Sequence, residues 1–416
     1  MAQALHSADD DTIPTDWDRL DCGSAAPVPT PLIRLLEGST TRMATTFNVL
    51  RTREAITRLA PTWYALVEGT EGASFSSPWW YLAWLDAFPV DALAVVTAHE
   101  GGELVGVLPL GRTRTDWKGM YLPRVAPFAR GDFQPPIMAA HLTETLLPQL
   151  LDIGRAALGK RHGLWWPNLR EDLGEVDAVR RYCEERGMPW IEEREPAPRL
   201  EIRGRSMQEV ECAWAASHRG DVRRQRRRLE ATAALTIWEP QSTDEALPAL
   251  EDFFEVHDAK WLAQGFPGRF ADAANREHFR AALRHMLGKG AHFSTLRVGD
   301  TDVSYIFGFM AGGWLQVYRP TFRPEFANFS PSKVHLGLLL EQGCTAGWMG
   351  IDFLLGAEGY KLQWSNAVIE TTTITAGSAS WAPSYLWYGR MRPALKNRYA
   401  GHLLRAKGLL QRWVGR

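Results

Sequence analysis

Apolar and polar residues follow one another along the chain with two periods, one typical of helices and one typical of strands. In the first half, apolar residues at helical spacing predict helices, and short apolar runs predict strands. The predicted helices cover residues 56–67, 78–88, 141–160 and 176–186, and the predicted strands cover residues 47–50, 93–99, 104–110 and 164–166. Strands 93–99 and 104–110 flank a short turn, Glu-Gly-Gly-Glu, so we expect them to form a hairpin.

The second half repeats this mixture of helices and a strand hairpin. Helices are predicted at 253–261 and 276–287, and strands at 291–298, 303–310, 314–318 and 369–374. The shared content of the two halves argues for an internal structural duplication and not for a short-period repeat. The chain has 416 residues, which exceeds the roughly 250–300 residues at which a single core stops growing, so two domains are expected.

The domain boundaries follow from shifts in composition. We expect a loose tail rich in Asp, Ser, Thr, Pro and Ala, then two mixed units, then a basic helical region. These four segments cover residues 1–44, 45–205, 206–385 and 386–416.

Residues 329–364 organise the second unit. Ser330 is predicted to cap a helix that starts at Pro331, where the missing N–H leaves no bond unmade. Apolar residues at 334, 336 and 338–340 supply a helix face, and Gly343 and Gly347 close it. The glycine-bounded apolar run 350–356 then predicts a buried strand.

Several residues in and after this strand carry chemistry. Asp352 lies inside the strand, where burying a carboxylate costs free energy. Such a residue is therefore expected to be paired with a cation or to serve in function. Just beyond the strand end, where sheets of α/β proteins usually place their sites, the chain carries Glu358, Tyr360, Lys361 and Trp364.

Composition narrows the class of protein. The apolar content of 45% and charged content of 23% are those of a globular protein, and the net charge of −1 gives no general nucleic-acid signal. None of the four cysteines forms a Cys-x-x-Cys pair, so we expect neither a zinc site nor a disulfide framework. No stretch approaches the ~20 apolar residues that span a bilayer, and the start of the chain is polar and acidic. These features predict a cytoplasmic enzyme without a metal.

Two segments are locally basic. The run 218–230 (HRGDVRRQRRRLE) fits a solvated helix face, a site for the phosphate of a cofactor, or a nucleic-acid contact. The near-neutral net charge of the whole chain argues against the nucleic-acid contact. The region 386–416 fits a solvated helix packed on the body, and contact with an acidic surface such as membrane headgroups stays open.

Several sequence segments, in this order, resemble a known family. They are SFSSPWWYLAW, SHRGDVRRQRRRLE, HDAKWLAQG, YRPTFRPEFANFSPSKVHLGLLLE and GIDFLLGAEGYKLQW. The second half resembles the acetyltransferase domain of CelD-type cellulose-biosynthesis proteins, within the GNAT superfamily. It is also similar to the Fem-type aminoacyl transferases, which carry two GNAT-like units. The resemblance implies an α/β (α+β) fold of two tandem GNAT-like units, each with a mixed, largely antiparallel sheet flanked by helices.

The resemblance also implies a donor site between strand 314–318 and the helix from Pro331, where the acyl-CoA pyrophosphate would meet a helix N-terminus. The usual GNAT loop, Gln/Arg-x-x-Gly-x-Gly/Ala, is absent, and Phe-Ser-Pro-Ser-Lys stands in its place. The expected co-substrate is acetyl-CoA or another acyl-CoA, bound only by the second unit. The expected donor-site residues are Tyr318, Arg319, Ser330, Ser332 and Lys333.

Acyl transfer needs a deprotonated nucleophile, a stabilised oxyanion and a proton for the leaving thiolate. We assign these roles to Asp352, Lys361 and Tyr360, respectively, while a structural Asp–Arg pair, an exposed lysine and a core tyrosine stay open as alternatives. The expected acceptor contacts are Trp261, Trp364, Trp79 and Asp132.

The leading hypothesis is an N- or O-acyltransferase acting on a sugar, a polysaccharide precursor or a small metabolite. One alternative is a Fem-type transferase that uses aminoacyl-tRNA, bound by the basic helices. The other is a non-catalytic scaffold of an exopolysaccharide system.

Overall fold

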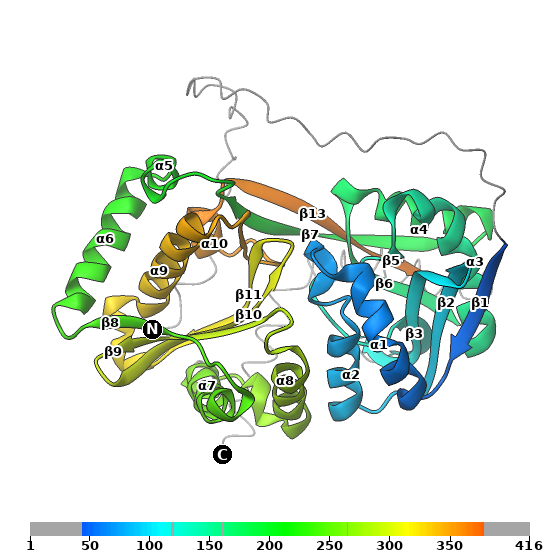
Figure 1. Ribbon diagram of the computed structural model, residues 1–416, viewed down its shortest axis with the longest axis horizontal. Helices are drawn as coiled ribbons and strands as arrows, with labels where there is room; N and C mark the ends of the chain where they lie inside the picture. The colour runs from blue at the N-terminus through cyan, green and yellow to red at the C-terminus, as the bar shows by residue number, and fades with distance from the viewer. Residues whose placement is uncertain (1–43, 118–119, 160–161, 264, 378–416) are drawn as a thin grey trace, which may run out of the picture. The chain divides into compact units, whose positions relative to one another are not determined.

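One continuous sheet runs through both halves of the described chain. The computed structural model describes residues 44–117, 120–159, 162–263 and 265–377, and within them thirteen strands form a single sheet (Figure 1). The hydrogen-bonded order is β1-β2-β3-β4-β6-β13-β7-β12-β11-β10-β9-β8, with β5 paired to β3. The expected α/β (α+β) class, with a mixed, largely antiparallel arrangement of strands flanked by helices, is confirmed, and the strands of the two expected units belong to one sheet. The predicted tail before Ala44 and the basic region 386–416 lie outside the described residues.

The first half contains the predicted elements and two strands, β4 and β5, that were not predicted. Ser77 begins α2 as expected, because its hydroxyl accepts a hydrogen bond from the N–H of Trp79 and Pro78 occupies the first helical position. The strands are β1 (Thr45–Leu50), β2 (Ala92–Glu100), β3 (Glu103–Trp117), β4 (Met120–Pro127), β5 (Ile137–Met138) and β6 (Gly163–Arg170). The helices are α1 (Arg53–Val67), η1 (Glu71–Ala73), α2 (Pro78–Ala87), η2 (Ala140–Leu142), α3 (Thr143–Leu158), η3 (Glu171–Leu173) and α4 (Glu175–Glu185).

In the second half, α7 and α8 cover one face of strands β8–β11, and α6 and α9 cover the other (Figure 1). The strands are β7 (Trp190–Glu201), β8 (Leu235–Trp238), β9 (Ala291–Val298), β10 (Thr301–Ala311), β11 (Trp314–Phe322), β12 (Gly350–Asp352) and β13 (Ala367–Ala376). The helices are α5 (Met207–Cys212), α6 (Ala216–Glu230), α7 (Thr243–Ala263), η4 (Arg269–Ala271), α8 (Ala273–Met286), η5 (Pro324–Phe329), α9 (Pro331–Ala346) and α10 (Gly359–Trp364). The expected helix 253–261 is thus the last part of a longer one.

The centre of the sheet joins the two halves. Strand β13, which comes last in the described chain, lies between β6 and β7 and pairs antiparallel with both. Strand β7 was not predicted, because its charged residues and its prolines at 196 and 198 lower strand propensity. Pairing with β13 and β12 overrides that propensity.

Each half contains one parallel strand pair. In the first half, Arg124 and Val125 of β4 pair with Gly163 and Leu164 of β6. In the second half, residues 314–316 of β11 pair with residues 350–352 of β12. All other strand pairs between the described elements are antiparallel, so this shared exception supports the duplication inferred from the sequence.

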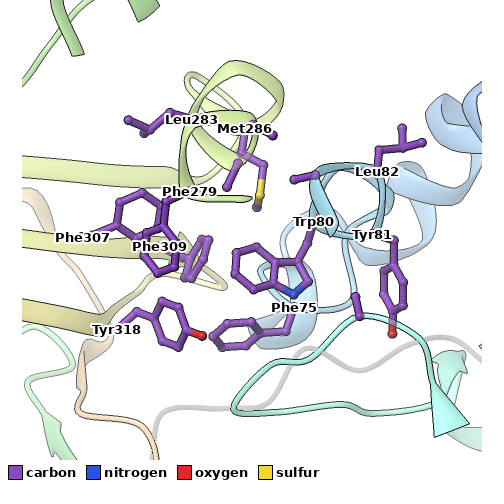
Figure 2. Close-up of a cluster of buried hydrophobic side chains, with 14 of the residues drawn as sticks. Phe75, Trp80, Tyr81, Leu82, Phe279, Leu283, Met286, Phe307, Phe309 and Tyr318 are labelled. Atoms are coloured by element: carbon purple, nitrogen blue, oxygen red, sulfur yellow. The ribbon is translucent and has the colours of Figure 1, made fainter. Parts of the chain in front are cut away.

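A shared aromatic core connects the first half to the second. Figure 2 shows Phe75 and Trp80, from the first half, facing Phe309 and Tyr318, which come from β10 and β11. The Phe75 ring lies 5.0 Å from that of Phe309 and 5.2 Å from that of Tyr318, in edge-to-face geometry. Trp80 makes the same type of contact with Phe309 at 5.5 Å. These contacts hold the loops of the first half against strand β11.

We expect Gly350→Ala to lower the free energy of unfolding by about 1–3 kcal/mol, the usual penalty for overpacking. Gly350 lies in β12 between two strands, and a Cβ there would come within 2.1 Å of the carbonyl oxygen of Leu200 and 2.6 Å of the Trp314 ring. Urea unfolding measures the effect. The control is Gly359→Ala, because a Cβ there meets nothing within 4 Å and should leave stability unchanged or slightly higher. Equal stability of the Gly350 variant and the wild type would refute the argument.

Candidate active site

Strands β11 and β12 form a fork. They pair in parallel only over 314–316 and 350–352, after which β11 continues to Phe322 without a strand partner on that side among the described residues. The chain after β12 turns toward β7, where the N–H groups of Phe353 and Gly356 donate to the carbonyls of Pro198 and Pro196. The strand predicted over 350–356 therefore ends at Asp352. The edge of β11 from Val317 onward faces the open side of the fork.

A local turn sets the end of β12. The backbone N–H of Leu354 donates to Asp352 Oδ1 at 2.8 Å, and Leu354 adopts a left-handed conformation with φ 57°. A side-chain oxygen that accepts from the backbone two residues later is a common way to make a turn. This turn opens the fork, because it directs the chain away from β11.

Helix α9 begins beside the far end of β11. Ser332 Oγ lies 3.2 Å from Ser304 Oγ and donates to the carbonyl of Thr321 at 3.4 Å, which joins the first turn of α9 to β10 and β11. The predicted start at Pro331 is confirmed, but the predicted side-chain cap is wrong. Ser330 has φ 48° and ψ 57°, so its carbonyl, and not its hydroxyl, accepts from the backbone N–H groups of Lys333 and Val334.

The predicted phosphate ligand Lys333 has a partner within the protein. Its ammonium group donates to Asp221 of α6, and this hydrogen bond is the main reason that the pKa of Asp221 falls to about 2. The ammonium group is therefore held close to the N-terminal end of α9, where the Asp221 carboxylate balances its charge.

Lys361 and Tyr360 follow the turn, in α10. Lys361 is buried, and its ammonium group donates to the carbonyl of Leu355 and pairs with Glu358 at 2.9 Å. The exposed-lysine alternative is therefore wrong. Tyr360 has 46% of its surface exposed, and desolvation, followed by the Glu358 carboxylate, raises its pKa to about 12.

Asp132, a predicted acceptor contact, comes to the fork from the first half. The loop between β4 and β5 carries it, and Leu355, Arg319 and Lys361 are among the groups that act on the pKa of its carboxyl group. Burial raises the pKa of Asp132, and the charges of Arg319, Lys361 and Arg269 oppose that rise. The fork thus brings together Asp132, Arg319, Tyr360 and Lys361, four residues that the sequence had singled out from distant segments.

Asp352, the predicted base, is fully buried and already satisfied. Its Oδ2 accepts from Arg199 Nε at 2.8 Å and from Nη2 at 2.7 Å, while Oδ1 accepts from Leu354. Arg199 also pairs with Glu71 at 2.7 Å, so the network joins η1 of the first half to β12. Burial raises the pKa of Asp352, and the Arg199 charge opposes this. This geometry favours the structural Asp–Arg pair that the sequence left open.

The three tryptophans assigned to acceptor contacts lie apart from one another. Trp364 is only 2% exposed and packs in the core, 4.8 Å from Trp214. Trp79 packs under the Lys289 ammonium group, 4.1 Å from its ring centroid. Trp261 is 41% exposed at the end of α7 and donates to His257 Nε2 at 3.2 Å. Among the described residues, none of these three contacts involves Asp132, Arg319, Tyr360 or Lys361.

Two residues near the fork, Arg130 and Arg269, were not singled out from the sequence. Arg130 immediately precedes Gly131 and Asp132, and Arg269 follows the loop Gly265–Gly268. A single arginine in a loop gives no sequence signal of its own. Their proximity depends on the contact between the two halves.

Residues 216–362 match the family model of an acetyltransferase (GNAT) domain. The matched segment spans β11, α9, β12 and Lys361. No curated protein matches the sequence of the chain.

Several solved structures align with this chain at low sequence identity. The crystal structure of FemX aligns with a TM-score of 0.53 and 11% identity, over 78% of this chain and 96% of that chain. A conserved protein of unknown function from Bacteroides thetaiotaomicron aligns with a TM-score of 0.52 and 11% identity, over 80% and 100% of the two chains. A tandem GNAT protein from the clavulanic acid biosynthesis pathway aligns with a TM-score of 0.44 and 12% identity, over 80% and 99%.

Two further observations concern the described residues only. No helix in them is long and apolar enough to cross a membrane. No group of three or more His, Cys, Asp or Glu side chains in the same residues is arranged to hold a metal ion.

Proposed function

We propose that this protein is an acyltransferase that moves an acyl group, acetyl from acetyl-CoA, to an amine or hydroxyl of a sugar, a polysaccharide precursor or a small metabolite. The observation that carries the proposal is the fork. An open strand edge on β11 ends beside the N-terminus of α9, so an extended donor can lie along the strand with its phosphates at the helix dipole. Lys333, Ser330 and Ser332 would bind those phosphates, and Tyr318 and Arg319 line the strand edge.

In this proposal, Asp132 takes the part that the sequence had given to Asp352. Asp132 accepts the proton of the attacking amine or hydroxyl, whose nitrogen or oxygen forms the new bond to the acyl carbon. The Lys361 ammonium group stabilises the oxyanion, and Tyr360 gives its proton to the leaving thiolate as the carbon–sulfur bond breaks. Asp352 acts as a positioning residue, because it turns the chain at Leu354 toward Leu355 and Lys361.

The fold of FemX supports a second candidate, transfer from aminoacyl-tRNA. Three of the six arginines of α6, which would contact the tRNA, pair with neighbouring carboxylates, and one of these is Arg223 with Glu211. Arg224 pairs with Asp221, and Arg226 pairs with Glu230 and Glu341. Because these pairs favour the solvated helix face, acyl-CoA is the donor that we propose. A scaffold without catalysis has no feature in its favour once Tyr360 and Lys361 are found beside the fork.

We expect acetyl-CoA to bind saturably in a calorimetric titration, and Lys333→Ala to weaken this binding about tenfold. The lost charge-assisted hydrogen bond to phosphate is worth about 1.5–3 kcal/mol, and 1.4 kcal/mol corresponds to one power of ten. Lys289→Ala is the matched control, because Lys289 stacks on Trp79 and not on the fork. If the wild type bound no acyl-CoA, the proposal would fail and charged tRNA would be titrated next.

A further inference from the structure

A chain of buried hydroxyl and imidazole groups joins the sheet to helix α9. Four of its members are at most 6% exposed: His292 and Ser294 of β9, Ser304 of β10 and His335 of α9. His292 Nε2 lies 3.0 Å from Ser294 Oγ, which lies 3.1 Å from His335 Nε2. The other ring nitrogen of His335, Nδ1, lies 3.3 Å from Ser304 Oγ, and Ser304 Oγ lies 3.2 Å from Ser332 Oγ. The chain of contacts therefore ends in the first turn of α9.

Both histidines of this chain are neutral near pH 7. Burial, followed by repulsion from His292, lowers the pKa of His335 to about 3. Burial lowers the pKa of His292 to about 4. A neutral imidazole has one N–H donor and one acceptor nitrogen, so the position of the hydrogen on each ring decides the direction of its hydrogen bonds.

The carbonyl of Thr321 fixes which nitrogen of His335 carries the hydrogen. Ser304 Oγ donates its single hydrogen to that carbonyl at 3.1 Å, because a carbonyl can only accept. His335 Nδ1 therefore donates to Ser304, and His335 Nε2 accepts the hydrogen of Ser294. Ser294 in turn accepts from His292 Nε2. Each donor between His292 and Ser304 thus points toward α9.

This direction decides what the Ser332 hydroxyl is free to do. It has two partners inside the protein, Ser304 Oγ and the carbonyl of Thr321, the second at 3.4 Å. An ionised phosphate oxygen only accepts, so Ser332 has to turn its hydrogen outward to bind one. The oxygen of Ser304 does not then lack a donor, because His335 supplies one, and Ser304 can give its own hydrogen to Ser332. With the hydrogen of His335 on Nε2, Ser304 would have to donate to Nδ1, and its oxygen would need the hydrogen of Ser332.

We propose that His335 is a positioning residue of the donor site, which acts through Ser304 to free the Ser332 hydroxyl for a phosphate of the acyl donor. The inference rests on the proposed function, because it concerns the phosphates at the start of α9. Without His335, an outward turn of Ser332 would leave the buried Ser304 oxygen without a donor, and an unsatisfied buried polar atom costs free energy. Hydrogen bonds aligned in a chain also strengthen one another, which favours the last bond, from Ser332 to phosphate.

The test is a double-mutant cycle on the full chain, with binding of acetyl-CoA measured by calorimetry. His335→Leu should weaken binding about fivefold, the value of one ordinary hydrogen bond. His335→Asn keeps an N–H donor near the position of Nδ1 and should bind within about twofold of the wild type. When Ser332 is already replaced in Ser332→Ala, His335→Leu should cause no further loss, because the two residues act on the same bond.

His278→Leu is the matched control. It removes another buried histidine, one that packs 4.4 Å from the Trp80 ring and is no member of the chain. This variant should bind acetyl-CoA as the wild type does. Thermal melting verifies that all variants fold.

A second measurement reports the hydrogen position itself. NMR of isotope-labelled histidine rings separates the Nδ1–H form from the Nε2–H form, because a ring nitrogen with a hydrogen and one without differ widely in chemical shift. The His335 signals are identified by their loss in His335→Asn. We expect the neutral Nδ1–H form, both with and without acetyl-CoA.

Several results would overturn the inference. The Nε2–H form would do so, as would wild-type affinity of His335→Leu or equally weak binding by the Leu and Asn variants. A loss of the same size with and without Ser332 would mean that His335 is only structural. If His335→Leu does not fold, the NMR result and the affinity of His335→Asn still decide. If the wild type binds no acetyl-CoA, the proposed function fails and the positioning role falls with it, whereas wild-type binding without coupling to Ser332 removes the inference alone.

Discussion

Arg199→Ala is expected to lower the free energy of unfolding by about 3–5 kcal/mol, the usual loss when one member of a buried ion pair is removed. The side chain of Arg199 is 4% exposed, and that of its partner Asp352 is fully buried. Without Arg199, the Asp352 carboxylate stays buried with only the N–H of Leu354 as a partner. Glu71 would also lose one of its two arginine partners, the other being Arg170. Urea unfolding at neutral pH measures the loss.

The pH dependence distinguishes a buried charge from lost packing. The pKa of Asp352 is already raised in the folded protein by burial, and loss of Arg199 raises it further. A raised folded-state pKa costs stability above that pKa, and the cost disappears as the pH falls toward the unfolded-state value of about 3.9. The stability gap between variant and wild type should therefore shrink in acid. A gap that stays constant with pH would point to packing alone.

Two control variants complete this experiment. Arg181→Ala removes an exposed pair with Glu144 and should cost less than about 1 kcal/mol. Arg199→Met combined with Asp352→Asn removes both charges and should recover part of the loss, because no unpaired charge then remains on β12.

Tyr360→Phe is expected to lower kcat by about 10²-fold or more, the usual contribution of a positioned general acid. The change removes only the hydroxyl that would protonate the leaving thiolate. Because the pKa of Tyr360 is raised to about 12, the wild-type phenol keeps its proton through the neutral and mildly alkaline range. Steady-state acetyl transfer, followed as released free thiol, gives kcat and KM. We expect KM for acetyl-CoA to change little.

The matched control is Tyr64→Phe. The Tyr64 hydroxyl donates to the carbonyl of Lys289 at 3.2 Å, which lies on the Trp79 side of the molecule. This variant should keep the wild-type kcat. If Tyr360→Phe kept it as well, Tyr360 would not be the acid, and the leaving thiolate would have to take its proton from Lys361 or from water.

Local signals in the sequence predicted most of the helices and hairpins. Ser77 and Pro78 gave the start of α2, and Pro331 and Gly347 bounded α9, because these residues act on their own neighbours. Strand β7 escaped prediction, because its prolines and charges argue locally against a strand. Its partners β13 and β12 lie more than 140 residues further along the chain.

The residues of the candidate site also separate into those that local sequence could indicate and those that depend on distant parts of the chain. Arg319, Tyr360 and Lys361 lie next to recognisable elements of the second half, so the sequence could point to them. The sequence could not tell which carboxylate would stay available at the fork. Arg199, 153 residues before Asp352, satisfies that side chain, whereas Asp132 reaches the fork only because the halves pack together.

The two parallel strand pairs, β4–β6 and β11–β12, differ in what lies beside them. In the first half, the loop after β4 lies against β6, where Trp166 Nε1 donates to the carbonyl of Gln134 at 2.7 Å and Asn168 Nδ2 donates to that of Gly131. The loop after β4 thus packs on β6 beside the β4–β6 pair. The same loop presents Arg130 and Asp132 to the fork between β11 and β12. Under the proposed function, donor and acceptor are recognised by separate pieces of chain. Exchanging residues of this loop while Asp132 is kept should retarget the enzyme to another acceptor, and its use of the donor should stay the same.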